Sequence, residues 1–273
     1  SRNKKRTAIT IVTLSAVGIL FMVTATVLSC ADPKEIARQE IESDYKISVD
    51  SWENDKMNPD RSWAEIMKNN PLNEEFIQEI QNIPGVENVE TKSYLNGTLV
   101  DLDPEDEITG AGVAGLGPVY AEELERALTE GAVTYEELEE GTAIVADKNY
   151  LHWYPELKIG DPIRISFRTA DGMAERTFRL AAFGDFPMGL SSASLILPTS
   201  VLESICPYNI TETCEITVDP DEKDTAYDAL QDLADTSAYL TTSSYEESLS
   251  QWESATALMG LAGYAFLIIL GGI

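Results

Sequence analysis

The sequence contains little of the chemistry on which most active sites depend. It has one histidine, His152, and three cysteines among 273 residues. A single imidazole argues against histidine-based catalysis and against histidine metal sites, which need several ligands. Basic residues are also scarce, because 19 lysines and arginines stand against 47 aspartates and glutamates, a formal net charge of −28. Nucleic acids are bound through positive surfaces, so we expect no nucleic-acid partner.

The few basic residues are unevenly placed. Four of them lie in the first six positions: Arg2, Lys4, Lys5 and Arg6. The acidic residues begin at Asp32 and end at Glu253. Residues 32–253 therefore hold the other 15 basic groups and all 47 acidic ones, a net charge of −32. This acidic stretch lies between two uncharged runs, which is not the layout of a simple cytosolic globule.

The first uncharged run, Thr7–Ala31, predicts a membrane helix. Its 25 residues exceed the roughly 20 that a helix needs to cross a hydrocarbon core. The basic residues before it predict a cytoplasmic N-terminus. A cleaved signal peptide is an alternative, but its apolar core is shorter and needs a small-x-small cleavage site. A lipoprotein would be lipidated at Cys30, although Leu28 occupies a position where that signal has a small residue.

The second uncharged run, Ser254–Ile273, has 20 residues and predicts a second span. Trp252 comes just before it, as expected of an aromatic anchor at the membrane interface. The alternative is a buried C-terminal helix of a soluble domain. Two spans place residues 32–253 outside the cytoplasm. Because the chain starts without methionine and stops inside this run, we expect a segment of a longer, multi-pass membrane protein.

The two remaining cysteines, Cys206 and Cys214, are eight positions apart in CPYNITETC. An exported location permits a disulfide across a short hairpin. Two free thiols are the other possibility, and the sequence does not decide between them.

A strand–helix–strand pattern occurs twice between the runs. The predicted elements of the first copy are a strand at 46–50, a helix at 73–83 capped by Asn73, and a strand at 86–95. Those of the second are a strand at 214–218, a helix starting at Asp219-Pro220, and a strand at 238–242. We expect the two copies to share one sheet. Charged segments at 32–45 and 244–252 are predicted to be helical stalks that extend the membrane helices.

The region between the copies, residues 104–213, predicts a β-rich lobe. A helix is expected at 121–128 and short strands at 142–146 and 194–197. Alternating apolar residues on both sides of Asp171-Gly172 predict a β-hairpin. The fold class is therefore an α+β extracytoplasmic domain flanked by two transmembrane helices.

Motifs for cofactors, metals and catalysis are weak. Gly110–Gly115 matches G-x-G-x-x-G, but an acidic, turn-like segment precedes it and Gly117-Pro118 follows, so we interpret it as a flexible glycine loop. The acidic run 101–107 lacks the glycine and glutamate positions of a calcium loop, and we interpret it as a solvated turn. His152 is expected to be packed rather than reactive. We expect no catalytic, cofactor or metal site.

The order of several motifs resembles the permease unit of MacB/FtsX-like ABC transporters. A basic stretch, Arg2–Thr7, runs straight into the first predicted span. Glu79–Val89 is similar to the helix–PGV–strand segment of the family's outer domain. Gly141–Val145, Leu157–Asp161 and Phe178–Phe183 are similar to its β-rich lobe, and Ser194–Pro198 resembles the strand that follows.

This resemblance implies a two-lobed outer domain. The porter-like lobe is made of two segments, 32–103, which includes the first stalk, and 214–243. The inserted lobe comprises residues 104–213. The membrane helices lie in residues 1–31 and 244–273. It also implies a separate cytoplasmic ABC ATPase subunit, contact with membrane lipid, a dimer or pseudo-dimer of permease units, and a protein partner outside the membrane. The chain itself is expected to be non-catalytic and to drive export or mechanical work.

The competing hypothesis is that the chain is the extracytoplasmic sensor of a signalling receptor. Such receptors also have a domain of this kind between two membrane spans.

Overall fold

The computed structural model describes residues 15, 17–19, 22, 23, 26, 32–49, 63–101, 110–186 and 195–271. The chain divides into two compact units. Residues 41–243 form one unit, and the segments on either side, 1–40 and 244–273, form the other.

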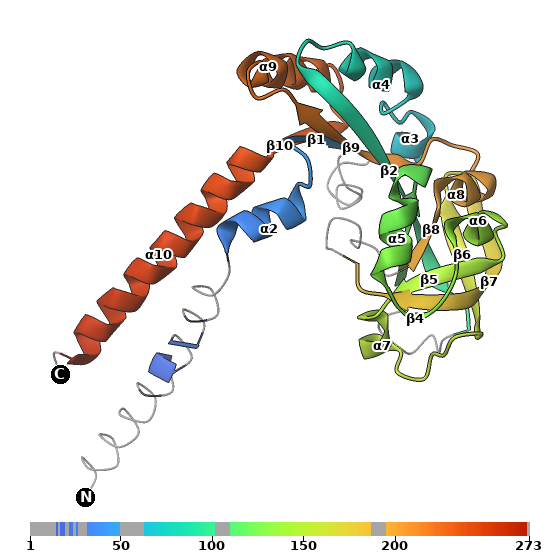
Figure 1. The fold of residues 1–273 in the computed structure, drawn as a ribbon, viewed down its shortest axis with the longest axis horizontal. Helices are drawn as coiled ribbons and strands as arrows, with labels where there is room; N and C mark the ends of the chain where they lie inside the picture. Colours follow the sequence, from blue (N-terminus) through green and yellow to red (C-terminus); the bar gives the residue numbers. More distant parts are fainter. Residues whose placement is uncertain are drawn as a thin grey trace, which may run out of the picture. The chain divides into compact units, whose positions relative to one another are not determined.

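The unit of residues 41–243 is built on one mixed sheet with helices packed on it (Figure 1). Its strand order is β10-β1-β9-β2-β3-β8-β5-β7-β4, and β6 pairs with both β2 and β7. The strands are β1 (Tyr45–Val49), β2 (Val86–Leu99), β3 (Gly110–Leu116), β4 (Leu128–Gly131), β5 (Ala143–Asp147), β6 (Pro162–Thr169), β7 (Gly172–Gly184), β8 (Leu195–Pro198), β9 (Thr211–Val218) and β10 (Leu240–Ser244).

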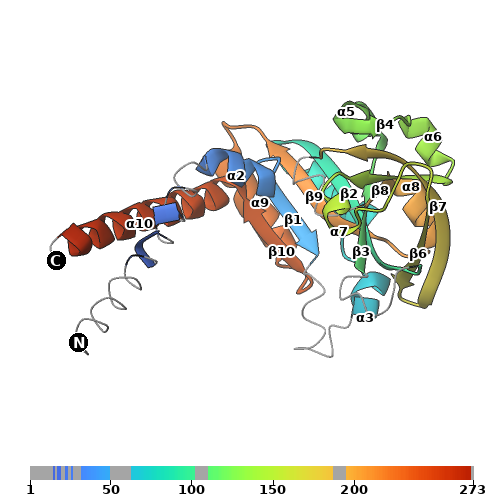
Figure 2. The same ribbon diagram turned by 90° about the horizontal axis from the view of Figure 1, so that it is seen from below.

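The two predicted strand–helix–strand copies share this sheet, and the prediction is confirmed. β9 lies between β1 and β2 and is antiparallel to both. β1 in turn separates β9 from β10, so strands of the two copies alternate (Figure 2). The crossover helices α4 (Glu74–Gln81) and α9 (Lys223–Ala234) contribute to one hydrophobic core with these strands. Each copy therefore depends on the other for its neighbours.

Local signals explain where α4 begins and ends. The Asn73 side chain accepts a hydrogen bond from the Phe76 N–H at 3.0 Å, which satisfies a free donor of the first turn. Gly85 has a φ of +86°, a conformation that glycine adopts at little cost, and it reverses the chain into β2.

The predicted start of the second crossover helix, with Asp219 as its cap and Pro220 as its first residue, is wrong by three residues. Asp219 accepts a hydrogen bond from Asp221 N–H through its side chain, 2.9 Å, and from Glu222 N–H through its carbonyl, 3.1 Å. These bonds close a turn, and α9 starts only at Lys223. An Asp-Pro pair favours this turn as well as a helix start.

The inserted region contains the predicted β-hairpin. β6 and β7 are antiparallel from Pro162↔Arg179 to Thr169↔Gly172. The turn residues are Ala170 and Asp171, one position earlier than predicted. The helical elements of this region are η3 (Pro118–Tyr120), α5 (Ala121–Ala127), α6 (Tyr135–Glu139), α7 (Tyr150–Trp153) and α8 (Thr199–Ile205); α3 (Trp63–Lys68) precedes α4. The division into porter-like and inserted lobes remains a prediction.

The interpretation of Gly110–Gly115 as a flexible loop is wrong, because these residues form the interior strand β3. β3 pairs with β2 on one side and with β8 on the other. A Cβ atom at Gly112 would lie 2.2 Å from the Tyr94 hydroxyl oxygen. Glycine is needed here because a neighbouring aromatic side chain crosses the strand, not because the backbone must bend.

The other unit contains two helices that pack together, α2 (Pro33–Glu40) and α10 (Tyr245–Gly271). The second predicted stalk is helical from Tyr245, but the first is helical only over Pro33–Glu40, because the chain leaves the helix at Ile41 and enters β1 at Tyr45. The predicted span Thr7–Ala31 lies outside the described residues apart from a few helical positions. Within the described part of the chain, no helix meets the length and hydropathy that a membrane crossing requires.

Candidate functional site

A connected cluster of polar side chains lies where β2 changes partners. Along one edge, β2 pairs with β9 from Val86 to Ser93 and then with β6 from Gly97 to Leu99. Along the other edge it pairs with β3. The register between β2 and β9 shifts between Lys92 and Ser93. This one strand thus belongs to both halves of the sheet.

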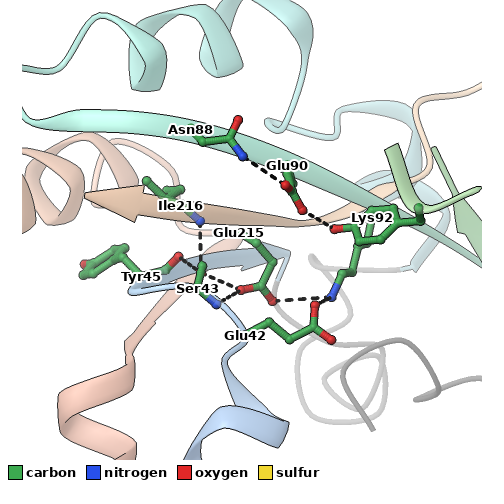
Figure 3. Close-up of polar contacts among 9 residues, drawn as sticks. Glu42, Ser43, Tyr45, Asn88, Glu90, Lys92, Glu215 and Ile216 are labelled. Atoms are coloured by element: carbon green, nitrogen blue, oxygen red, sulfur yellow. Dashed lines mark hydrogen bonds and ion pairs between the residues drawn. The ribbon is translucent and has the colours of Figure 1, made fainter. Parts of the chain in front are cut away.

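We call the side chains around this point the junction cluster: Glu42, Ser43, Glu90, Lys92, Tyr120 and Glu215. They come from the segment before β1, from β2, from η3 and from β9. Figure 3 shows the Glu215 carboxylate between Ser43 and Lys92.

Lys92 is the cation of the junction cluster. Its Nζ lies 2.5 Å from Glu42 Oε2 and 4.0 Å from Glu215 Oε1. It also lies 5.8 Å from the centroid of the Tyr120 ring. The Lys92 and Glu215 side chains are only 13% and 7% exposed. A buried carboxylate needs such a partner, because desolvation of an isolated charge is very unfavourable.

Ser43 connects the entering chain to β9. Its hydroxyl donates to Glu215 Oε2 at 2.7 Å and accepts from the Ile216 N–H at 3.1 Å. The next residue, Asp44, accepts from Val218 N–H through its side chain and from the Tyr227 hydroxyl through its carbonyl, at 3.1 and 2.9 Å. The segment that leads into β1 is therefore held firmly to the sheet.

Tyr120 connects η3 to β2. Its hydroxyl donates to Glu90 Oε2 at 2.7 Å. The Asn88 amide donates to the other Glu90 oxygen at 2.9 Å (Figure 3). Burial, and then the bond to Glu90, raise the pKa of Tyr120, so the phenol stays a neutral donor at physiological pH.

The junction cluster joins four segments of the chain through ion pairs and hydrogen bonds. It brings three carboxylates to one ammonium, which is engaged with two of them, and it includes no thiol, imidazole or glycine-rich anion cradle. Among the described residues, no group of three or more acidic, histidine or cysteine side chains is placed to hold a metal ion. The junction cluster ties the entering chain, the central strand and the inserted region into one body.

The residues singled out from the sequence lie elsewhere. Arg2, Lys4, Lys5 and Arg6 are outside the described residues. Trp252 is half-buried on α10, and its role as an interface anchor remains a prediction. The expectation that His152 is packed is wrong: it is exposed on α7, where its ring meets Trp153 edge-on at 5.4 Å. None of these residues belongs to the junction cluster.

Cys206 and Cys214 are both free thiols in the structure and both are buried. They lie in different hydrophobic cores. Cys206 contacts Met67, with 3.6 Å between the sulfur atoms, whereas Cys214 packs with the residues between β9 and α9. Burial raises the pKa of both thiols, that of Cys214 to about 12.

We expect neither Cys206 nor Cys214 to react with iodoacetamide in the folded protein. Because the thiolate is the nucleophile and a raised pKa keeps the thiol protonated, Cys214 should react about 10³-fold more slowly than an ordinary cysteine near pH 8, even before its burial is considered. Peptide mass spectrometry should find both alkylated after denaturation without reductant. Modification that requires prior reduction would instead show a disulfide.

The solved structures that are similar to this fold include the following two. The periplasmic region of MacB from Actinobacillus actinomycetemcomitans is 15% identical, with a TM-score of 0.44, over 74% of this chain and 88% of that one. The extracellular domain of the noncanonic ABC-type transporter YknZ from Gram-positive bacteria is 15% identical, with a TM-score of 0.42, over 73% and 98% of the two chains. No family model matches the sequence, and no curated protein matches it. At these identities the likeness concerns the fold alone.

Proposed function

We propose that this chain is a permease segment of an ABC transporter. Its outer domain couples ATP hydrolysis by a separate cytoplasmic subunit to export or to mechanical work outside the membrane. The observation that carries the proposal is the placement of exposed apolar side chains. Of the ten large apolar side chains exposed in the described residues, seven lie on the two uncharged runs: Val17, Ile19, Met22, Val23, Leu258, Met259 and Leu261. Such apolar surface suits contact with lipid.

The packing of α2 against α10 supports a coupled pair of membrane connections. The Arg38 guanidinium lies 3.7 Å from the centroid of the Tyr245 ring. The Ser248 hydroxyl, buried in this contact, donates to Glu40 Oε2 at 2.5 Å. Two helices held in this way transmit movement as a pair rather than separately.

The short connections into the outer domain support the same role. Residues 41–44 join α2 to β1 and are bonded to β9 and α9 as described above. At the other end, β10 ends at Ser244 and α10 begins at Tyr245, without an intervening residue. A coupling domain requires such links, because a long flexible linker would absorb the movement.

The proposal also names the remaining parts of the system. Residues 32–253 face outward, the basic N-terminal residues stay in the cytoplasm, and an ABC ATPase subunit binds the cytoplasmic side. Two permease units form a dimer or pseudo-dimer in the lipid bilayer. The outer domain binds a protein partner outside the membrane. The sequence motifs quoted above support this assignment, and hydrolysis belongs to the ATPase subunit.

A disulfide between the stalk helices tests the coupling. In a Cys30→Ser background, oxidation of the Glu40→Cys/Ser248→Cys pair is expected to lower ATPase activity of the reconstituted complex by about fivefold, the lower end of typical coupling free energies. Reduction should restore the activity. The matched control pairs Glu40→Cys with Glu247→Cys, an exposed neighbour of Ser248.

Unchanged activity in the crosslinked complex would show that the stalks do not carry the coupling. A complete reading frame that continues beyond Ile273 into a kinase or coiled-coil module, with no further membrane helices, would replace the transporter proposal with the signalling receptor.

A further inference from the structure

A cavity of about 340 Å³ opens beside α7 in the inserted region. Its apolar floor includes Leu99 and Ile163, which are 9% and 4% exposed. Small-molecule sites in proteins typically range from about 300 to 1,000 Å³, so this cavity suits a compact ligand. The junction cluster does not line it.

Three aromatic side chains line the cavity: Tyr150, Trp153 and Tyr154. The rings of Tyr150 and Tyr154 are 4.7 Å apart between centroids and inclined at 54°. Trp153 is 58% exposed, so its ring is accessible to a ligand. An exposed indole presents a π-face that attracts cations more strongly than the faces of the other aromatic side chains.

The charge around the cavity is of one sign. Two carboxylate residues, Glu156 and Asp161, are part of its lining, and no lysine, arginine or histidine is among the lining residues. Lys158 lies between them in the chain, and its backbone N–H donates to Asp161 Oδ2 at 2.8 Å. The acidic excess of residues 32–253 has the same sign and favours the approach of cations.

Tyr150 lies at the wall of the cavity and is 3% exposed. Burial, and then the neighbouring Tyr154, raise the pKa of its phenol, so this part of the wall stays uncharged at physiological pH.

We propose that this cavity binds a compact organic ammonium ion, with its cationic group against the Trp153 ring and the Glu156 carboxylate and its apolar groups over Leu99 and Ile163. Apolar surface, aromatic faces and carboxylates together select this class over anions and over neutral apolar molecules. The inference does not rest on the transporter proposal, since it concerns only residues 99–163.

Choline and its uncharged isostere 3,3-dimethyl-1-butanol test the site. The two differ at the quaternary nitrogen, which the alcohol replaces with carbon. Isothermal titration calorimetry of the full chain in an uncharged detergent is expected to show choline binding with a millimolar dissociation constant. The alcohol should bind at least about fivefold more weakly, because it lacks the charge that the ring and the carboxylate attract.

Trp153→Ala is expected to weaken choline binding by about tenfold, and Trp153→Phe, which keeps a π-face, by less. Glu156→Gln, at an exposed position, should weaken it by about two- to fivefold. Met173→Ala removes an apolar side chain of similar exposure, 59%, on the β6–β7 hairpin, and should leave binding unchanged.

Three results would overturn the proposal: no choline binding up to tens of millimolar, equal affinity for the alcohol, or undiminished binding by Trp153→Ala. Because the measurement needs neither ATP nor the ATPase subunit, its failure is separate from a failure of the stalk experiment.

Discussion

Lys92→Met is expected to lower the free energy of unfolding by about 3–5 kcal/mol, the usual cost of removing one partner from a buried ion pair. Methionine keeps most of the volume of the side chain and removes the charge. Glu215, 7% exposed, would then keep the neutral donors of Ser43 but lose its nearest cation in the junction cluster. Urea denaturation of the full chain, followed by circular dichroism, measures the change.

Two variants make the Lys92 result specific. Lys148→Met removes the cation of an exposed pair with Asp185, in which the side chains are 46% and 55% exposed, and should change stability by less than about 1 kcal/mol. Lys92→Met/Glu215→Gln should recover part of the loss, because the unpaired carboxylate is gone. A Lys92→Met protein as stable as the Lys148→Met protein would contradict the role assigned to the junction cluster.

Phe167→Ala is expected to destabilise the protein by about 3–5 kcal/mol, the range for deleting a buried aromatic side chain. Phe167 is fully buried on β6, and its ring meets that of Phe178 edge-on at 6.3 Å between centroids. The substitution removes this contact and leaves a cavity in the hydrophobic core that packs on this face of the hairpin.

Met173→Ala is the matched control for Phe167→Ala. It lies on the same hairpin, where its side chain is 59% exposed, and should change stability by about 0.5 kcal/mol or less. Thermal unfolding of both variants in the full chain measures the difference. Equal effects would mean that the hairpin is not packed as described.

Elements with strong local signals were predictable from the sequence. The cap at Asn73, the spacing of Phe76 and Ile80, and the alternation around Asp171-Gly172 all act within a few residues. The start of α9 was missed because Asp219 supports both a helix cap and a turn. That choice depends on the surroundings, in which Asp219 N–H also bonds to the Gly85 carbonyl at 2.7 Å.

Features that depend on distant residues were not predictable. Gly110–Gly115 has the composition of a loop, and only the position of Tyr94 on the neighbouring strand explains why glycine fits in β3. The exposure of His152 depends on how α7 packs in the connection between β5 and β6, and the aromatic residues beside it in the sequence do not indicate this.

The junction cluster is the clearest case of such a distant feature. Lys92 and Glu42 are 50 positions apart, and Ser43 and Glu215 are 172 apart. A single basic residue in an acidic chain carries no sign of which carboxylates surround it. The strand repeat indicated a shared sheet, but the register that brings these side chains together comes from the tertiary structure.

The alternation of strands in the sheet has a consequence for how the chain is made. β1 is synthesised early, but its partner strand β9 is synthesised more than 160 residues later. Tyr45 of β1, for example, pairs with Ile216 of β9. Until β9 arrives, β1 and half of β2 have open edges, which are prone to pair with other chains. The hairpin of β6 and β7 can form at once, whereas β1 must wait for β9 near the end of the domain. Slow completion of the sheet, and a need to protect its open edges until β9 is made, are therefore built into the strand order.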